Sequence, residues 1–269
     1  MSKRPLVLIG IVIVILVVIR IVEPSASKPS VATNKPSSAS SSGATQAPSS
    51  IVSDIASVPE TTLQIIGKGS AEAYPHAISS PALSNRQKPE VFYEGAEFCP
   101  YCATERWAMA VALAKFGTFT NLKLTHSSLT DVYPDTHTLS FYGSTYTSSY
   151  INFTSVELYS DIPADGFFTQ LQTPTAEEQT LTNKYDTNES IPFIDFGGKY
   201  VVSGATYSPS VLQGRSWSEI AGSLSDPNNA IAKGVDGAAN TLTAAICKLT
   251  NNQPGDVCNA TVITLEDSL

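Results

Sequence analysis

The pattern of hydrophobic positions is strongest at the N-terminus, where residues 5–22 form an apolar run broken only by one glycine and Arg20. As a helix, this run spans about 27 Å, close to the thickness of the hydrocarbon core of a bilayer. Lys3 and Arg4 precede it and favour a cytoplasmic N-terminus. We therefore expect residues 1–23 to be a single-pass signal-anchor in the cell membrane, with the rest of the chain extracytoplasmic. A cleaved signal peptide is the alternative.

A segment rich in serine and proline follows this run. Residues 24–50 contain ten serines, four prolines and no aromatic residue. Such a composition cannot bury enough apolar surface to offset the entropy that ordering costs. The segment is therefore expected to be a disordered linker, and residues 51–269 are expected to form the folded extracytoplasmic domain.

Within residues 51–269, short apolar runs alternate with segments of helical periodicity, which predicts an α/β domain. The clearest pair is a buried strand at 91–93 followed by a helix that ends near residue 116. The other predicted strands lie at 61–66, 121–126, 138–142, 150–159, 192–196 and 199–203. The other predicted helices lie at 175–185, 208–224 and 228–249. The strands at 138–142 and 150–159 are interpreted as an inserted strand pair or hairpin.

Charge is distributed unevenly along the chain. The net charge is −8, and because the first 50 residues carry +4, the remainder carries −12. An acidic domain of this kind is repelled by nucleic acid and by anionic lipid, which excludes a nucleic-acid-binding function. His76, His126 and His137 have no metal-ligand spacing with one another or with carboxylates, so neither a metal site nor a cofactor is predicted.

Cys99 and Cys102 lie where the strand at 91–93 gives way to the following helix. Free backbone N–H groups and the helix dipole stabilise a thiolate at such a position. Pro100 suits the first helical turn because it lacks an N–H. The two-residue spacing, which Tyr101 completes, lets Cys102 close a disulfide with Cys99. The pattern favours a redox site; an inert structural disulfide or half of a zinc site is the alternative.

The second pair of cysteines, Cys247 and Cys258, follows the last predicted helix. An even number of cysteines outside the cytoplasm favours disulfides. We interpret Cys247–Cys258 as a structural bridge that staples the C-terminal tail and contributes about 3 kcal/mol by the loop-entropy argument. A zinc site of four cysteines fits poorly, because ten residues separate this pair.

The segment 190–203 contains a second informative pattern. Pro192 opens an apolar strand, and Gly197-Gly198 permits a tight turn into the next strand. One interpretation is a plain hairpin. The other is a cis Ile191–Pro192 peptide bond beside the cysteines, where the missing N–H leaves room for a substrate backbone. The residues alone leave both open.

The order strand, C-x-x-C at a helix start, helix, strand, insertion, Ile-Pro strand, Gly-Gly turn, strand and helix resembles the thioredoxin-like superfamily. More closely, EGAEFCPYCATERWAMAVALAKFG, IPFIDFGGKYVVSGATY and AICKLT…PGDVC are similar to the family known as domain of unknown function 929, and the similarity spans most of the exported domain. The resemblance implies a thioredoxin-like fold, in which helices flank a central mixed sheet. It places a β-rich and helical insertion at about 128–190 and a C-terminal helical extension at 225–269. It also implies three catalytic residues: the nucleophile Cys99, the resolving thiol Cys102 and the cis-proline Pro192.

Two positions depart from the superfamily pattern. Tyr93 stands where thioredoxins keep a buried acid, so proton transfer to the resolving thiol needs another group; Glu97, Glu105 and water are the candidates. Glu97 also stands where glutaredoxins carry a lysine, and a carboxylate there would repel glutathione.

The sequence therefore predicts a membrane-anchored extracytoplasmic thiol–disulfide oxidoreductase, which exchanges disulfides with protein partners or with a partner redox protein. The residues expected to support its site are Tyr93, Glu97, Pro100, Tyr101 and Ile191. The alternative is a non-catalytic thioredoxin-like scaffold or binding domain of the envelope, in which both disulfides are structural. A reduction potential of Cys99–Cys102 well below about −300 mV indicates the scaffold, and one between about −120 and −270 mV the enzyme.

Overall fold

The computed structural model describes residues 42–85, 87–186 and 190–269. The predicted membrane anchor and most of the predicted linker lie outside these residues. Across the described ranges, no helix is both long and apolar enough to cross a membrane.

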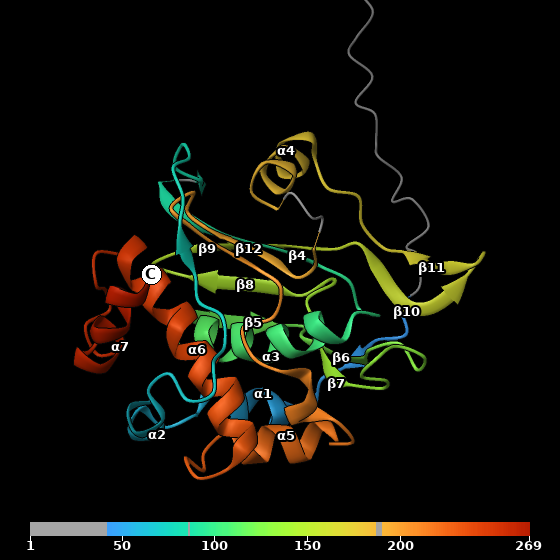
Figure 1. The fold of residues 1–269 in the computed structure, drawn as a ribbon, viewed down its shortest axis with the longest axis horizontal. Helices are drawn as coiled ribbons and strands as arrows, with labels where there is room; N and C mark the ends of the chain where they lie inside the picture. Colours follow the sequence, from blue (N-terminus) through green and yellow to red (C-terminus); the bar gives the residue numbers. More distant parts are fainter. Residues whose placement is uncertain (1–41, 86, 187–189) are drawn as a thin grey trace, which may run out of the picture. The chain divides into compact units, whose positions relative to one another are not determined.

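A mixed β-sheet forms the centre of the fold (Figure 1). Its strands are β2 (His76–Ala77), β3 (Ser84–Asn85), β4 (Lys88–Gly95), β9 (Asn152–Glu157), β12 (Phe193–Phe196) and β13 (Tyr200–Ser203). The central strand, β4, pairs in parallel with β9 and antiparallel with β12, and β13 and β2 extend the sheet beyond β12. Parallel strands need a crossover connection, and α3 (Pro100–Ala114) lies in the one between β4 and β9.

The two faces of the sheet are covered by different helices (Figure 1). Side chains alternate along β4. Val91 and Tyr93 therefore lie in the large hydrophobic core, which α3 and α6 (Ala230–Leu249) also line. Phe92 lies in a smaller cluster on the opposite face, where α4 (Ala176–Tyr185) packs. This alternation decides which residues of β4 meet the cysteines and which meet α4.

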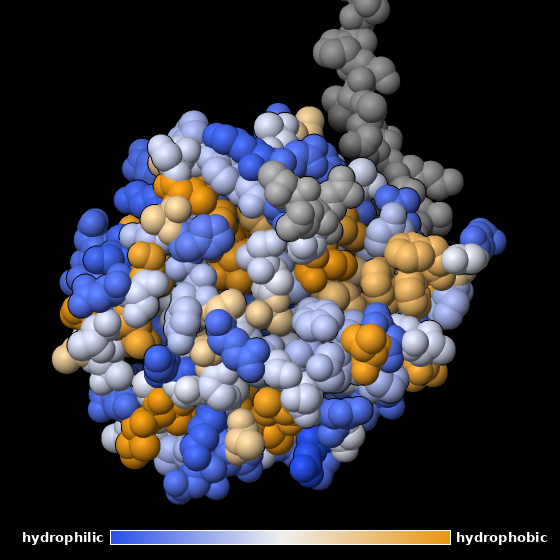
Figure 2. Space-filling model, viewed as in Figure 1, coloured by the Kyte–Doolittle hydropathy of each residue, from blue (hydrophilic) through white to orange (hydrophobic). Residues whose placement is uncertain are grey.

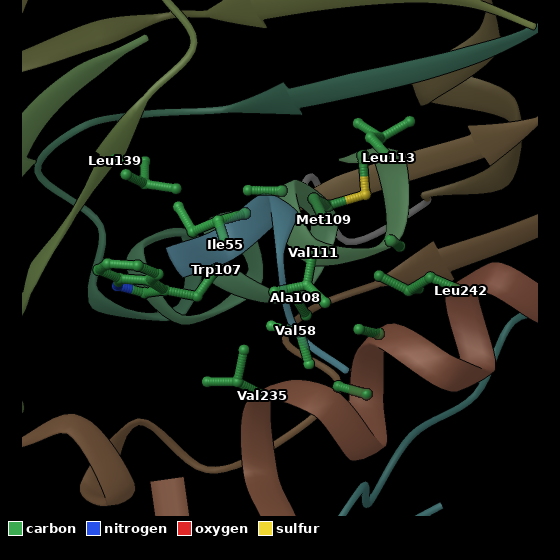
Figure 3. Packing of buried hydrophobic residues seen from close by; sticks show 14 of the residues in the cluster. Ile55, Val58, Trp107, Ala108, Met109, Val111, Leu113, Leu139, Val235 and Leu242 are labelled. Atoms are coloured by element: carbon green, nitrogen blue, oxygen red, sulfur yellow. The ribbon is translucent and has the colours of Figure 1, made fainter. Parts of the chain in front are cut away.

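α3 is enclosed on nearly all sides, so every side chain from residue 102 to residue 113 is buried. Its Ala108 and Val111 lie in one cluster with Val235 and Leu242 of α6 (Figure 3). Side chains in a closely packed protein interior are held in place by their neighbours. The first turn of α3, which carries the two cysteines, is therefore positioned by the core.

Smaller elements surround this core. The further helices and helical turns are α1 (Ser49–Ala56), α2 (Glu60–Ile66), η1 (Pro209–Leu212), α5 (Trp217–Ser223), α7 (Ala260–Leu265) and η2 (Glu266–Ser268). The further strands are β1 (Thr45–Gln46), β5 (Gly117–Thr120), β6 (Lys123–His126), β7 (His137–Ser140), β8 (Thr145–Ser148), β10 (Tyr159–Ala164) and β11 (Phe167–Gln170). β1, β6 and β7 form one small sheet, while β5–β8 and β10–β11 form antiparallel pairs.

The folded domain begins before residue 51, earlier than predicted. β1 pairs with β6. α1 begins at Ser49 and buries Ile51 and Ile55 in the core. These two isoleucines provide the apolar surface that the serine-rich segment before them lacks, so the linker boundary placed at residue 50 is wrong.

Two predicted strands have different structures. Residues 61–66 lie in the helix α2, where Leu63 is buried and Asn240 of α6 donates hydrogen bonds to the carbonyls of Leu63 (2.8 Å) and Gly67 (2.7 Å). The strand expected at 150–159, in an inserted hairpin, is instead β9 of the central sheet. Residue propensity indicated a strand there, but it does not encode the partner strand.

The helix predicted at 208–224 is interrupted. η1 and α5 are separate, and Gly214 between them has φ 68°, a conformation that favours glycine. Ser216 then begins α5 with a capping box, because its hydroxyl accepts from the Glu219 N–H while the Glu219 carboxylate accepts from the Ser216 N–H.

Candidate active site

Cys99 is the residue that caps α3. The chain leaves β4 at Gly95, and Pro100 occupies the first helical turn, where it loses no hydrogen bond. The Cys99 sulfur accepts a hydrogen bond from the backbone N–H of Cys102, with an N···Sγ distance of 3.2 Å. The local pattern predicted this placement, and a helix N-terminus favours a negatively charged sulfur.

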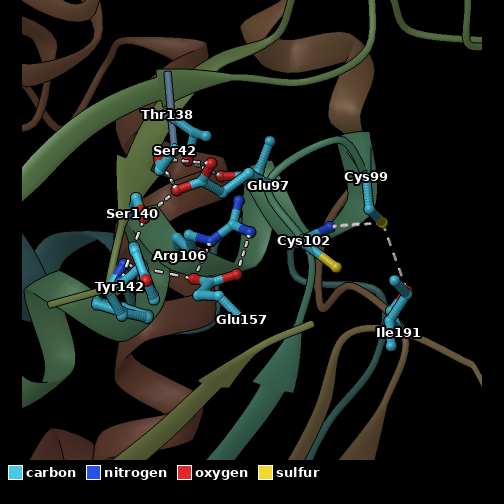
Figure 4. Close-up of polar contacts among 12 residues, drawn as sticks. Ser42, Glu97, Cys99, Cys102, Arg106, Thr138, Ser140, Tyr142, Glu157 and Ile191 are labelled. Atoms are coloured by element: carbon cyan, nitrogen blue, oxygen red, sulfur yellow. Dashed lines mark hydrogen bonds and ion pairs between the residues drawn. The ribbon is translucent and has the colours of Figure 1, made fainter. Parts of the chain in front are cut away.

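The structure brings Cys99, Cys102 and the Ile191–Pro192 segment together (Figure 4). Cys99 and Cys102 are free thiols. The Cys99 thiol donates to the carbonyl oxygen of Ile191, with an Sγ···O distance of 3.7 Å. The Ile191–Pro192 peptide bond is cis. The sequence left open whether this segment is a plain hairpin or carries a cis bond beside the cysteines, and the structure shows the cis bond.

The two sulfurs differ in acidity. Hydrogen bonding from the Cys102 side chain lowers the pKa of Cys99, the Cys102 backbone and the charge of Arg106 lower it further, and burial opposes the shift. Burial raises the pKa of Cys102 well above its usual value. Cys99 is 5% exposed and Cys102 is fully buried. The arrangement therefore favours ionisation of Cys99 and disfavours ionisation of Cys102.

A buried ion pair lies behind the thiols (Figure 4). Arg106 of α3 donates to the Glu157 carboxylate through Nε (2.8 Å) and Nη2 (2.7 Å), and both side chains are fully buried. Glu157 also accepts from the backbone N–H of Phe141. Burial lowers the pKa of Arg106, but the charge of Glu157, its hydrogen bonds and the other nearby groups together outweigh burial, so the pKa is raised. Arg106 is thus a permanent cation that favours ionisation of Cys99. Sequence reasoning missed this pair, because the two residues are 51 positions apart.

Tyr93 lies next to this ion pair. Its ring centroid is 6.0 Å from the Arg106 guanidinium carbon, and its buried hydroxyl has no hydrogen-bond partner among the described residues. Burial raises its pKa, and negative charge on either cysteine raises it further. Gly95 is required beside it, since a Cβ there would lie 2.2 Å from the Tyr93 hydroxyl oxygen. Tyr93 thus stays protonated.

Neither candidate acid of the sequence has a hydrogen bond to either sulfur in the part of the chain that the structure describes. Glu97 accepts from Ser140 Oγ (2.5 Å) and from Ser42 Oγ (2.8 Å), and it ties the start of the domain to β7. Glu105 accepts from the N–H (2.8 Å) and hydroxyl (2.7 Å) of Thr206. Burial raises the pKa of both carboxyls, that of Glu105 to about 7. Their geometry supports the fold at the site rather than proton transfer.

Aromatic side chains form the rim of the site. Tyr101 of the motif is 41% exposed and meets Tyr133 edge to face, with 6.0 Å between ring centroids. Phe98 stacks on Phe168 of β11, with 4.3 Å between centroids, and contacts Phe167 edge to face. Figure 2 shows hydrophobic residues gathered over the β10–β11 hairpin. The hairpin thus places an apolar surface next to Cys99.

The other two cysteines form the disulfide Cys247–Cys258, as predicted. The bridge joins the last turn of α6 to the residue before the N-cap of α7, and both sulfurs are buried. Within the described ranges, no group of three or more His, Cys, Asp or Glu side chains is placed to hold a metal ion.

Fold and site together define a class of protein: a mixed α/β domain with two free cysteines at a helix N-terminus, next to a cis-proline. The chain belongs to the family described as Domain of unknown function (DUF929), which it matches over residues 74–165 and 165–248. No curated protein and no solved structure matches the chain.

Proposed function

We propose that this protein is a thioredoxin-like thiol–disulfide oxidoreductase, held at the outer face of the cell membrane by its N-terminal segment. The single observation that carries the proposal is the position of the Cys99 sulfur. It accepts from the Cys102 N–H at a helix N-terminus and lies 3.7 Å from the carbonyl oxygen of Ile191. Inert structural cysteines need neither of these contacts.

The topology supports the thioredoxin-like part of the proposal. The succession β4, α3, β9, α4, β12 and β13, followed by C-terminal helices, supports that fold. The sequence resemblance instead takes the strand at 121–126 as the one after the helix and places β9 in the insertion. In the sheet, β4 lies between β9 and β12, and only the β4–β9 pairing is parallel. The additional strands precede and follow β9 without interrupting this arrangement.

The reaction follows from the two acidities. The Cys99 thiolate attacks one sulfur of a substrate disulfide; the Cys99–substrate bond forms, the substrate S–S bond breaks, and the second substrate sulfur leaves as a thiolate. Cys102 gives its proton to that thiolate and attacks Cys99. The Cys99–Cys102 bond forms, and the first substrate sulfur leaves and takes a proton from water. The substrate gains two electrons, and the protein's dithiol becomes a disulfide.

The reverse sequence oxidises a substrate dithiol. In either direction, a partner thiol–disulfide protein restores the starting state of Cys99 and Cys102. The relative reduction potentials of the partners set the net direction.

The location outside the cytoplasm rests on two features. The apolar run at 5–22, preceded by Lys3 and Arg4, supports a membrane anchor with a cytoplasmic N-terminus. The Cys247–Cys258 disulfide suits an oxidising compartment.

The scaffold function has one observation in its favour. Cys99 is only 5% exposed, so an outside sulfur reaches it only by displacing or fitting against its neighbours. In that alternative, the domain binds a partner in the envelope, and the two cysteines stay unreactive.

Trapping of the mixed disulfide tests the proposal. The Cys102→Ser variant keeps the nucleophile but lacks the resolving thiol, so we expect it to accumulate reducible covalent adducts with disulfide substrates. The matched control is Cys99→Ser, which keeps the buried thiol and should accumulate none. Absence of adducts with both variants would support the scaffold, and equal adduct formation by the two would contradict the assignment of Cys99 as the nucleophile.

A further inference from the structure

A cavity of about 610 Å³ lies beside the cysteine site, between the β10–β11 hairpin and α4. Phe98 and Ile191 both line it. Phe98 directly precedes Cys99, and the Ile191 carbonyl accepts from the Cys99 thiol. The cavity and the reactive sulfur therefore have two neighbouring residues in common.

Two carboxylates line this cavity. Glu94 projects from the α4 face of the sheet, because it alternates with Tyr93 along β4. It is 7% exposed, and its Oε2 has no hydrogen-bond partner among the described residues. Asp186, at the end of α4, is 4% exposed and accepts from the Ser203 hydroxyl through Oδ1 (2.8 Å).

No cation balances these two carboxylates in the part of the chain that the structure describes. Neither takes part in an ion pair there, and no Lys, Arg or His lines the cavity. Burial, together with the negative charges of Glu178 and Asp186, raises the pKa of Glu94 to about 7. A buried carboxylate with a free oxygen and like-charged neighbours gains most from a cation that donates hydrogen bonds.

The rest of the cavity suits a long cationic side chain. Phe98, Tyr159 and Phe167 present aromatic surface, which packs against an aliphatic stem and attracts a positive charge. Gln179 and Asn183 of α4 provide amide oxygens. A hard metal ion prefers a compact shell of oxygens, whereas this cavity is partly aromatic.

We propose that the cavity binds the side chain of a lysine or arginine near the reacting cysteine of a polypeptide substrate, with Glu94 and Asp186 as the anionic partners. The inference rests on the proposed exchange function and adds the substrate class to it. The carboxylates determine specificity and take no part in the bond changes at sulfur.

The binding test does not depend on exchange. Fluorescent, cysteine-free peptides carrying serine in place of the reacting cysteine, and lysine, arginine, norleucine or glutamate two residues away, are titrated against the reduced protein by fluorescence anisotropy. We expect the lysine and arginine peptides to bind about tenfold more tightly than the norleucine peptide, as one charge-assisted hydrogen bond provides. The glutamate peptide should bind most weakly.

Three isosteric variants locate the preference. Glu94→Gln and Asp186→Asn should each reduce the preference for lysine over norleucine to about twofold or less, if the charge pair supplies it. Glu72→Gln removes an equal charge from an exposed site and should keep the preference. Thermal unfolding of each variant verifies that it is folded.

Matched disulfide-containing peptides then test exchange, with kcat/KM expected to follow the same order. Equal binding of the lysine and norleucine peptides by the wild type, or an undiminished preference in both cavity variants, would overturn the inference. A binding preference that follows the expected order, with no exchange on any peptide, would confirm the cavity site and contradict the proposed function.

Discussion

The two cysteine pairs lie at opposite ends of helices. Cys99 caps the N-terminus of α3, where backbone N–H groups and the positive end of the helix dipole face the sulfur. Cys247 lies in the last turn of α6, where carbonyl groups and the negative end of the dipole disfavour a thiolate. The first pair consists of free thiols and the second is bonded.

The surroundings reinforce this difference. The buried guanidinium of Arg106 favours ionisation of Cys99, and the Ile191 carbonyl accepts from its thiol. Ile191 also lines the cavity. Cys247 is instead enclosed in the hydrophobic core with Cys258. We infer from this comparison that helix polarity and the nearest buried charge suit the first pair to exchange and the second to a structural bridge.

The largest expected effect is on disulfide reduction, which should depend on the first cysteine pair and not on the second. Cys99→Ser should reduce insulin disulfide reduction by several orders of magnitude, to the uncatalysed rate, because a hydroxyl cannot replace the thiolate nucleophile. Turbidity of precipitating insulin chains measures the rate. The double variant Cys247→Ser/Cys258→Ser is the control and should retain activity. Comparable losses in both variants would remove the functional distinction between the pairs.

Removal of the buried cation tests its influence on the first pair. Arg106→Met leaves Glu157 charged and unpaired in the interior, which should cost about 3–5 kcal/mol of unfolding free energy. It should also raise the pKa of Cys99, measured from the pH dependence of thiolate absorbance or alkylation. The double variant Arg106→Met/Glu157→Gln should recover much of the stability but not the low thiol pKa. Recovery of both would show that Arg106 acts only through packing.

Removal of the second bridge tests its structural role. Cys247→Ser/Cys258→Ser should lower the unfolding free energy by about 3 kcal/mol, because the unfolded chain regains the entropy of an open loop. Denaturant titration measures the change. A loss below a few tenths of a kcal/mol would show that the helical contacts of α6 and α7 hold the tail without the bridge.

Measurements of stability and of exchange activity across a pH series distinguish ionisation of the Cys99 thiol from loss of the folded state. Asp236 of α6 is fully buried, and neither of its oxygens has a hydrogen-bond partner among the described residues. Burial raises its pKa from 3.8 to about 8. The folded state therefore keeps a proton that the unfolded state releases, and stability should fall as pH rises from about 4 to about 8.

The midpoint of thermal unfolding should thus be lower at pH 8 than at pH 5, and Asp236→Asn should reduce the difference. Exchange at Cys99 should rise over the same interval, because its thiolate fraction grows. Stability that increases toward pH 8 in the wild type would contradict the assignment of Asp236 as a buried neutral acid.

Local sequence patterns correctly predicted the features of the site that depend on residues close together along the chain. The placement of Cys99 at a helix start follows from an apolar strand, a proline and helical periodicity within some twenty residues. The bridge between Cys247 and Cys258 follows from their proximity along the chain. The cis-proline was one of two open interpretations, since Ile191 lies 92 residues from Cys99 and only the resemblance linked them.

Long-range partners had no such signal. Arg106 and Glu157 pair across 51 residues, and a buried ion pair leaves no periodicity in the sequence. The sequence indicated only that Glu94 lies at the end of a strand. The cavity that Glu94 lines is built by α4 and the β10–β11 hairpin, which are distant in sequence, so no local pattern predicted it. β9 carried the propensity of a strand but nothing that identified β4 as its partner.

The reduction potential of Cys99–Cys102 tests the central claim most directly. Equilibration in glutathione or dithiothreitol buffers, followed by alkylation and mass analysis, gives the fraction of each pair that is oxidised. We expect a potential between about −120 and −270 mV for Cys99–Cys102 and one below about −300 mV for Cys247–Cys258. A value below about −300 mV for Cys99–Cys102, or failure of the pair to oxidise at all, would contradict the account.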